Sequence, residues 1–122
     1  MSPLEAVREF HVAFDVPIAP VPLVPIDETK HLRIKLITEE FNELSDALEA
    51  DDLVEIADAL ADLTVVVYGT ALSYGIDLDA VFEEVHRSNM TKLGEDRKPI
   101  YREDGKVLKG PNFEPPRIAE VW

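Results

Sequence analysis

A nearly apolar stretch over residues 56–72 restricts the possible folds of this chain more than any other feature of its sequence. Its first part reads IADALADLTVVVY, in which apolar side chains point to every side of a helix and the clearly polar residues are Asp58, Asp62 and Thr64. A helix that is apolar all round is buried, and two charges exclude a membrane span, which needs about 20 apolar residues. The stretch therefore predicts a buried helix over about residues 52–74, in which two ionised carboxylates need a partner.

Three other segments have the apolar spacing of amphipathic helices. A short helix is expected over residues 3–14, a long one from Asp27 to about residue 50, and a fourth after Asp77, with Asp27 and Asp77 as caps. The apolar stripes are Val7, Phe10 and Phe14 in the short helix, Ile37, Phe41, Leu44 and Leu48 in the long one, and Leu78, Val81, Phe82 and Val85 in the last.

Outside the C-terminal tail, no segment alternates between apolar and polar residues as a strand would. The predicted fold class is therefore all-α. We expect a bundle of four to five helices with a short irregular or hairpin C-terminal tail. Because a helix that is apolar all round needs more packing partners than one small chain offers, the bundle should be completed by oligomerisation.

The length of 122 residues suits one domain, since two independent cores would each have about 60 residues and marginal stability. We therefore expect a single domain over residues 1–122, with a helical core over about residues 3–93. Residues 16–26 contain four prolines and predict an ordered connector rather than a strand pair. Turn-forming residues fill the tail over residues 94–122, where residues 103–106 could form a short hairpin.

The charge balance and the lack of cysteine exclude several kinds of function. Asp and Glu outnumber Lys and Arg 25 to 12, which gives a net charge of −13 and opposes binding to nucleic acid or to an anionic membrane. Without cysteine there is no disulfide scaffold, thiolate zinc site, iron–sulfur cluster or cysteine nucleophile. The N-terminus has no signal-peptide pattern, so we expect a cytoplasmic protein.

Carboxylates on the two central helices are expected to converge on a metal ion. At about 100° per residue, Glu40 and Glu43 share one face of the long helix beside its apolar stripe, while Glu39 points to the far side. Hard Mg²⁺ or Mn²⁺ prefers such oxygen ligands. The predicted metal ligands are Glu40, Glu43, Asp58 and Asp62, with Glu55, which shares the face of the two aspartates, as an additional candidate.

One alternative would remove the need for a metal. Arg33 and Lys35 are the nearest basic residues on the facing helix, and either could pair with Asp62. Five candidate carboxylates exceed these two cations, so a divalent metal explains the excess better.

Three residues outside the acidic helices are candidates for substrate binding. Asn89 and Lys92 continue the stripe of the fourth helix, where they either mark its end or reach the metal site to bind phosphate, ribose or base. His11 either contacts a base or packs in the core.

The acidic helices resemble those of the all-α nucleoside triphosphate pyrophosphohydrolase superfamily, the MazG-like proteins that include dimeric dUTPases and phosphoribosyl-ATP pyrophosphohydrolase. Residues 39–43, EEFNE, fit the EExxE element of that family. Residues 58–71 resemble its second acidic helix, with Asp62 at the Asp of ExxD, and residues 86–92, HRSNMTK, resemble its closing Asn/Lys element. The resemblance covers about residues 5–93.

The chain departs from the family pattern at one position. Ala59 stands where ExxD has its Glu. Asp58, one residue earlier and one turn from Asp62, is the expected replacement, and Glu55 completes an ExxD of its own with Asp58.

The resemblance implies metal-dependent hydrolysis of a nucleoside triphosphate to the monophosphate and pyrophosphate, in a homodimer or a dimer of dimers. It implies catalytic roles for Glu39, Glu40 and Glu43 and substrate binding by Asn89 and Lys92. Removal of noncanonical or excess nucleotides is the expected role. The alternatives are phosphoribosyl-ATP hydrolysis in histidine biosynthesis and a noncatalytic helical dimerisation module.

Overall fold

The computed structural model describes all residues from 1 to 122 and contains α-helices but no strand, which confirms the all-α prediction. The helices are α1 (Pro3–Ala13), α2 (Asp27–Glu49), α3 (Leu53–Ser73) and α4 (Leu78–Met90), followed by the short 3-10 helix η1 (Ile118–Glu120). The chain separates into two compact units, residues 1–76 and residues 77–122. A single domain over the whole chain stays a prediction.

Side chains at the helix starts explain several of these boundaries. Ser2 Oγ accepts a hydrogen bond from the Glu5 N–H at 3.2 Å, and the Glu5 carboxylate accepts one from the Ser2 N–H at 3.1 Å, which forms a capping box on α1. Asp77 caps α4 as expected, by accepting a main-chain N–H bond at 3.1 Å. The expected cap of α2 is wrong, because Asp27 is already helical and the residue before it, Ile26, has no side chain able to cap.

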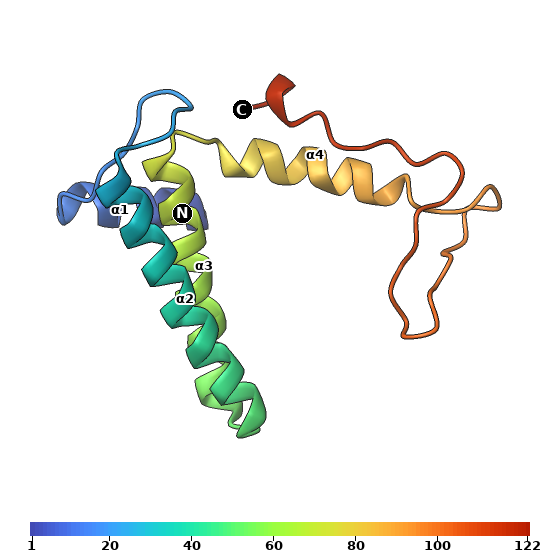
Figure 1. Cartoon of the computed structure of the whole chain (residues 1–122), viewed down its shortest axis with the longest axis horizontal. Coiled ribbons are helices and arrows are strands. Elements are labelled where there is room, and N and C mark those ends of the chain that lie inside the picture. Colours follow the sequence, from blue (N-terminus) through green and yellow to red (C-terminus); the bar gives the residue numbers. More distant parts are fainter. The chain divides into compact units, whose positions relative to one another are not determined.

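The helices α2 and α3 form an antiparallel hairpin in the first unit (Figure 1). The turn between them has three residues, in which Asp51 adopts a left-handed φ of 53° and Asp52 caps α3 by accepting from the Glu55 N–H at 3.2 Å. Ala47 on α2 and Ala59 on α3 are both buried. Side chains as small as these let two helices pack closely.

The proline-rich connector between α1 and α2 lies against the end of α3. The Ala19 N–H donates to the Leu72 carbonyl and the Leu23 N–H to the Tyr74 carbonyl, both at 2.9 Å. This ordered connector without a strand was expected. Gly75 ends α3 with a φ of 70°, a left-handed conformation that glycine adopts without strain.

Large apolar side chains remain on the outside of the hairpin. The all-round burial predicted for residues 56–68 of α3 is wrong for the single chain, since Leu60 is 51% exposed and Val65 is 42% exposed. Phe41 and Leu48 on α2 are exposed as well. By length and mean hydropathy alone α3 could cross a membrane, a test that core helices also pass. The physical reason for the exposure is that one hairpin and one short helix cannot cover every side of α3.

In the second unit, the tail folds back along α4 (Figure 1). Ser88 Oγ on α4 donates to the Glu114 carbonyl at 2.7 Å, and the Arg117 N–H donates to the Glu84 carboxylate at 2.8 Å. The expected hairpin is reduced to one isolated bridge between Tyr101 and Val107.

Candidate functional site

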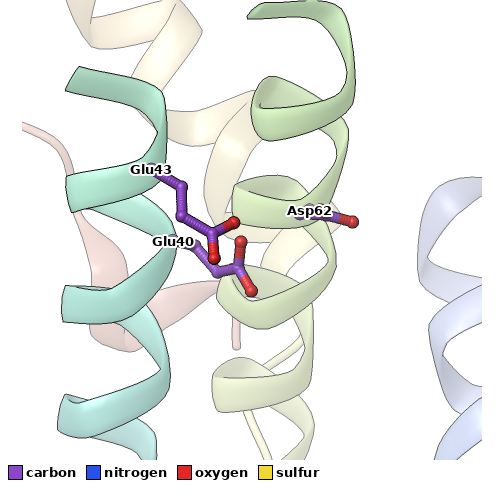
Figure 2. Close-up of side chains that lie close together, drawn as sticks. All are labelled: Glu40, Glu43 and Asp62. Atoms are coloured by element: carbon purple, nitrogen blue, oxygen red, sulfur yellow. The ribbon is translucent and has the colours of Figure 1, made fainter. Parts of the chain in front are cut away.

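Three carboxylates of the first unit lie close together on α2 and α3. Glu40 and Glu43 come from α2 and Asp62 from α3, and one oxygen atom of each lies within 4.8 Å of the others. Figure 2 shows the Glu40 and Glu43 carboxyl groups side by side between the two helices, with Asp62 on α3. Residues three apart share a helix face, and the hairpin brings the third acid opposite them. We call Glu40, Glu43 and Asp62 the acidic cluster.

Glu40 has a buried carboxylate oxygen within the acidic cluster. Its Oε2 atom is buried and has no hydrogen-bond partner, and no other buried side-chain oxygen or nitrogen in the chain is in this state. Burial raises the pKa of Glu40, and the negative charges of Glu43, Asp62 and Glu39 raise it further. A buried oxygen without a partner is costly, so this position needs a proton or a cation.

No lysine or arginine neutralises the acidic cluster. Arg33 instead donates from Nε to Thr70 Oγ1 at 3.0 Å and from Nη2 to the Val66 carbonyl at 2.9 Å. Lys35 is exposed and forms no ion pair, and the ion pairs of the chain are Lys30–Asp27, Arg87–Glu84, Arg87–Glu114 and Arg102–Asp104. The alternative in which Arg33 or Lys35 pairs with Asp62 is therefore wrong, because Thr70 and Val66 of α3 hold the guanidinium of Arg33 and Lys35 forms no ion pair.

The donor set of the acidic cluster fits a hard divalent cation. Three carboxylates supply only oxygen ligands, which Mg²⁺ and Mn²⁺ prefer. The buried Glu40 Oε2 has a lone pair that no protein donor uses. The acidic cluster could therefore hold a metal ion.

The other predicted acids lie outside the acidic cluster. Asp58 and Glu55 line a neighbouring hollow of about 310 Å³ between α2 and α3, together with Glu43, Asp46 and Asp52. This hollow is open and acidic, and it shares Glu43 with the acidic cluster. Metal binding by Asp58 and Glu55 stays a prediction.

Glu39 is exposed, as its position on the far side of the stripe predicts, and its charge contributes to the raised pKa of Glu40. A catalytic role for Glu39 stays a prediction.

Asn89 and Lys92 lie at the end of α4 in the second unit. The helix continues through Met90 and Thr91 is its C-cap, so Asn89 does not end the helix. The Lys92 N–H donates to the Asn89 carbonyl at 3.1 Å, and the Lys92 carbonyl accepts from the Gly110 N–H at 2.8 Å. Their roles toward substrate stay predictions.

His11 is in the interior of the first unit. It is 3% exposed, and its Nδ1 atom lies 3.4 Å from the Pro17 carbonyl oxygen. Burial lowers the pKa of His11, the bond to Pro17 opposes this, and the charge of Arg33 lowers it further. The predicted contact of His11 with a nucleobase is untested.

Sequence reasoning missed two features of the structure. One is the set of residues that hold the tail against α4, and the other is the buried position of Arg33. Ser88 and Thr91 both contact Glu114, 23 to 26 residues away in sequence, and no local pattern signals this. Arg33 had a signal, because it precedes Ile37 by four residues and Glu40 by seven and so lies on the same side of the helix.

Comparison with known proteins adds a family likeness to this geometry. A model of the phosphoribosyl-ATP pyrophosphohydrolase family matches residues 7–89, which include α2, α3, the acidic cluster and most of α4. An uncharacterized protein of Acanthamoeba polyphaga mimivirus is 42% identical over 79 residues, which cover 62% of this chain and 32% of the viral protein. The chain thus spans about a third of the length of that relative.

Proposed function

This chain belongs to the phosphoribosyl-ATP pyrophosphohydrolase family, within the MazG-like all-α superfamily, and on this premise we propose that it hydrolyses nucleoside triphosphates to nucleoside monophosphates and pyrophosphate with Mg²⁺. The observation that carries the proposal is the acidic cluster, with its buried and unpartnered Glu40 Oε2 and no basic residue to neutralise it. Removal of noncanonical or excess nucleotides is the proposed role.

Glu40, Glu43 and Asp62 would hold the divalent cation. Such a cation supplies positive charge that stabilises the negative charge of the phosphates during the reaction. Glu39 is exposed and its charge acts on Glu40, and in this proposal its carboxylate orients a water molecule and accepts its proton as the water oxygen bonds to phosphorus. The bond from phosphorus to the departing pyrophosphate breaks in the same displacement, and no covalent intermediate with the protein is needed.

Lys92 and Asn89 are the proposed substrate-binding residues of the second unit. The ammonium group of Lys92 would bind a phosphate, and the amide of Asn89 would bind the ribose or the base. Neither side chain is engaged in an ion pair, and Asn89 is exposed at the end of α4.

We propose that the active form is a homodimer or a dimer of dimers in the cytoplasm. The support is the exposed apolar surface of the hairpin, where Leu53, Val54 and Leu60 on α3 and Phe41 on α2 are each more than half exposed. Apolar patches of this kind commonly mark contacts between chains. A second copy would bury them without any change in the fold.

A second substrate is supported by the family model, whose description names phosphoribosyl-ATP. That reaction also releases pyrophosphate, so the same acidic cluster serves it. The two substrates are separated by measuring pyrophosphate release from dUTP, dCTP, other triphosphates and phosphoribosyl-ATP, each with and without Mg²⁺ or Mn²⁺.

The test of the proposed function is that metal-dependent pyrophosphate release. We expect release from at least one triphosphate with Mg²⁺ and none with a chelator. Release from phosphoribosyl-ATP alone would favour the histidine pathway, and no release from any of these compounds would favour a noncatalytic helical module.

A further inference from the structure

Arg33 is a buried cation without an anionic partner. Its side chain lies inside the first unit and the residue is 5% exposed, yet no carboxylate is within ion-pair distance of it. A guanidinium group keeps its proton in a protein, so burial of this charge is unfavourable until an acceptor meets it. Two of its donors are used, by Thr70 and by the Val66 carbonyl, and Nη1 donates to no protein atom and is not among the buried unpartnered atoms, so it is open to a ligand or to water.

The guanidinium of Arg33 is held in one position by its neighbours. A methyl group added at Gly69 would lie 2.5 Å from Arg33 Nη2 and 2.7 Å from His11 Nε2, so the glycine makes room for both side chains. His11 is fixed in turn at the Pro17 carbonyl, and its lowered pKa keeps the ring uncharged beside Arg33. The fold therefore orients a planar set of donors rather than merely tolerating a charge.

The Arg33 side chain opens onto a cavity of about 410 Å³ in the first unit. We call it the Arg33 pocket, and its polar lining includes Arg33, Ser73 and Thr29, with the exposed Glu28 at the same cavity. Its remaining lining is aliphatic, from Val16, Pro17, Ile26 and Leu32. Apolar walls around a few oriented polar groups are typical of a small-molecule site.

We propose that the Arg33 pocket receives the nucleobase of the substrate and that Arg33 Nη1 donates to a ring carbonyl oxygen. This inference rests on the proposed function. Aliphatic walls suit a flat ring, and a group with donors only selects acceptors. Uracil, thymine, cytosine and guanine carry ring carbonyls, whereas adenine carries an amino group instead.

The position of the pocket along α2 agrees with this assignment. Arg33 and Glu40 are seven residues apart on one side of the helix, which corresponds to about 10 Å along its axis. One nucleotide can therefore place its base at Arg33 and its phosphates at the acidic cluster.

The first test is base preference. With Mg²⁺, kcat/KM for dUTP and dGTP should exceed that for dATP by roughly ten-fold or more, because one well-placed guanidinium contact discriminates by about that much. Arg33→Lys keeps the charge but loses the planar fork, and should reduce this ratio. Equal kcat/KM for all bases would overturn the proposal.

The second test does not depend on replacing a buried residue. Leu32 lines the pocket and is 46% exposed, so Leu32→Trp should narrow the cavity and raise KM while leaving the fold intact. Ile34→Trp is the matched control, because Ile34 is 56% exposed on the same helix and does not line the pocket. An unchanged KM in Leu32→Trp would overturn the proposal. If the oligomer mass changed at the same time, the pocket would be assigned to contact with a second copy of the chain.

A binding experiment separates failure of this inference from failure of the proposed function. If no triphosphate is hydrolysed, the proposed function fails, and the pocket is tested by titrating the protein with dUMP, dGMP and dAMP under NMR observation. Shifts at residues 26–33 with dUMP or dGMP, and weaker ones with dAMP, would support the pocket. Absence of shifts with all three would overturn it.

Discussion

Replacing Glu40 by glutamine should stabilise the metal-free protein. In the acidic cluster the carboxylate oxygens lie within 4.8 Å of one another, and two unit charges at that distance repel by about 0.9 kcal/mol in a water-like dielectric and about 3.5 kcal/mol at an effective dielectric of 20. Glu43 is exposed, so solvent screening favours the lower figure. Glu40 has two such neighbours, and Glu40→Gln should therefore raise the free energy of unfolding by about 2 kcal/mol.

The pH dependence of this effect has a defined sign. Burial and the neighbouring acids raise the pKa of Glu40 above its ordinary value of 4.5, so the folded chain keeps this proton to a higher pH than the unfolded chain does. Stability contributed by the protonated group is complete below about pH 4.5 and is lost as the pH rises through the raised pKa. The difference between Glu40→Gln and the parent protein should therefore be small at pH 4 and reach its full size at neutral pH.

The assay is thermal or urea unfolding at fixed protein concentration, with a chelator and then with Mg²⁺ or Mn²⁺. A gain of about 2 kcal/mol corresponds to roughly 6–8 °C in the midpoint for a chain of this size. Metal should raise the midpoint of the parent protein and have little effect on Glu40→Gln, because a ligand is missing. Glu49→Gln, a change of an exposed acid on the same helix, is the matched control and should stay within about 0.5 kcal/mol of the parent. Equal midpoints of Glu40→Gln and the parent at neutral pH without metal would refute the reasoning.

Three other outcomes are expected. The Asp62→Asn variant should keep the helical circular dichroism of the parent but lower Mg²⁺-dependent pyrophosphate release by roughly a hundred-fold or more. The reason is that the bound cation stabilises the transition state by several kcal/mol. Activity near the parent level would contradict this. Lys92→Ala should raise KM in initial-rate measurements at similar kcat, and an unchanged KM would place Lys92 outside the site. The bonds from Arg87 and from the Arg117 N–H lower the pKa of Glu84 to about 2, so their stabilisation of the tail is present above about pH 4.5 and lost as the pH falls towards 2. Limited proteolysis should then find the tail cleaved faster in Glu84→Gln at neutral pH, and equal cleavage rates would contradict this role of Glu84.

The helices could be predicted because their signals are local. Asp77 acts as a cap in the structure as predicted, and Ser2 with Glu5 forms a cap of the same local kind. The prediction for Asp27 was wrong because the capping residue lies just before the helix. In the structure Asp27 is the first residue of α2, and Ile26 occupies the cap position. The face shared by Glu40 and Glu43 likewise follows from spacing along one helix.

The acid on the facing helix could not be fixed in the same way. Spacing along α3 puts Asp58 and Asp62 on one face, but the choice between them depends on the register of α3 against α2. That register is set by the three-residue turn with its left-handed Asp51 and by the packing of the buried Ala47 and Ala59. The structure brings Asp62 into the acidic cluster and leaves Asp58 one turn away, beside the neighbouring hollow.

The folded tail was beyond sequence reasoning for a related reason. Ser88 and Glu114 meet only when residues 94–113 have turned back, and each residue alone reads as an ordinary polar position. Turn-forming residues predict that the chain bends in this region, but they do not predict which side chain the returning segment will contact.

Two uncompensated charges of opposite sign lie on one side of α2, at Arg33 and at Glu40. Their backbone positions are about 10 Å apart along the helix axis, and the pKa of Glu40 is raised by burial and by the neighbouring acids with no opposing effect from Arg33. Arg33, which is held by Thr70 and Val66, therefore does not neutralise the charge of the acidic cluster. The hairpin keeps the two groups apart, and a ligand that brings an acceptor to Arg33 and a cation with phosphates to the acidic cluster would meet both of them. A nucleotide with a bound divalent metal has that distribution of charge, which is why the acidic cluster and the Arg33 pocket are best understood as two ends of one site.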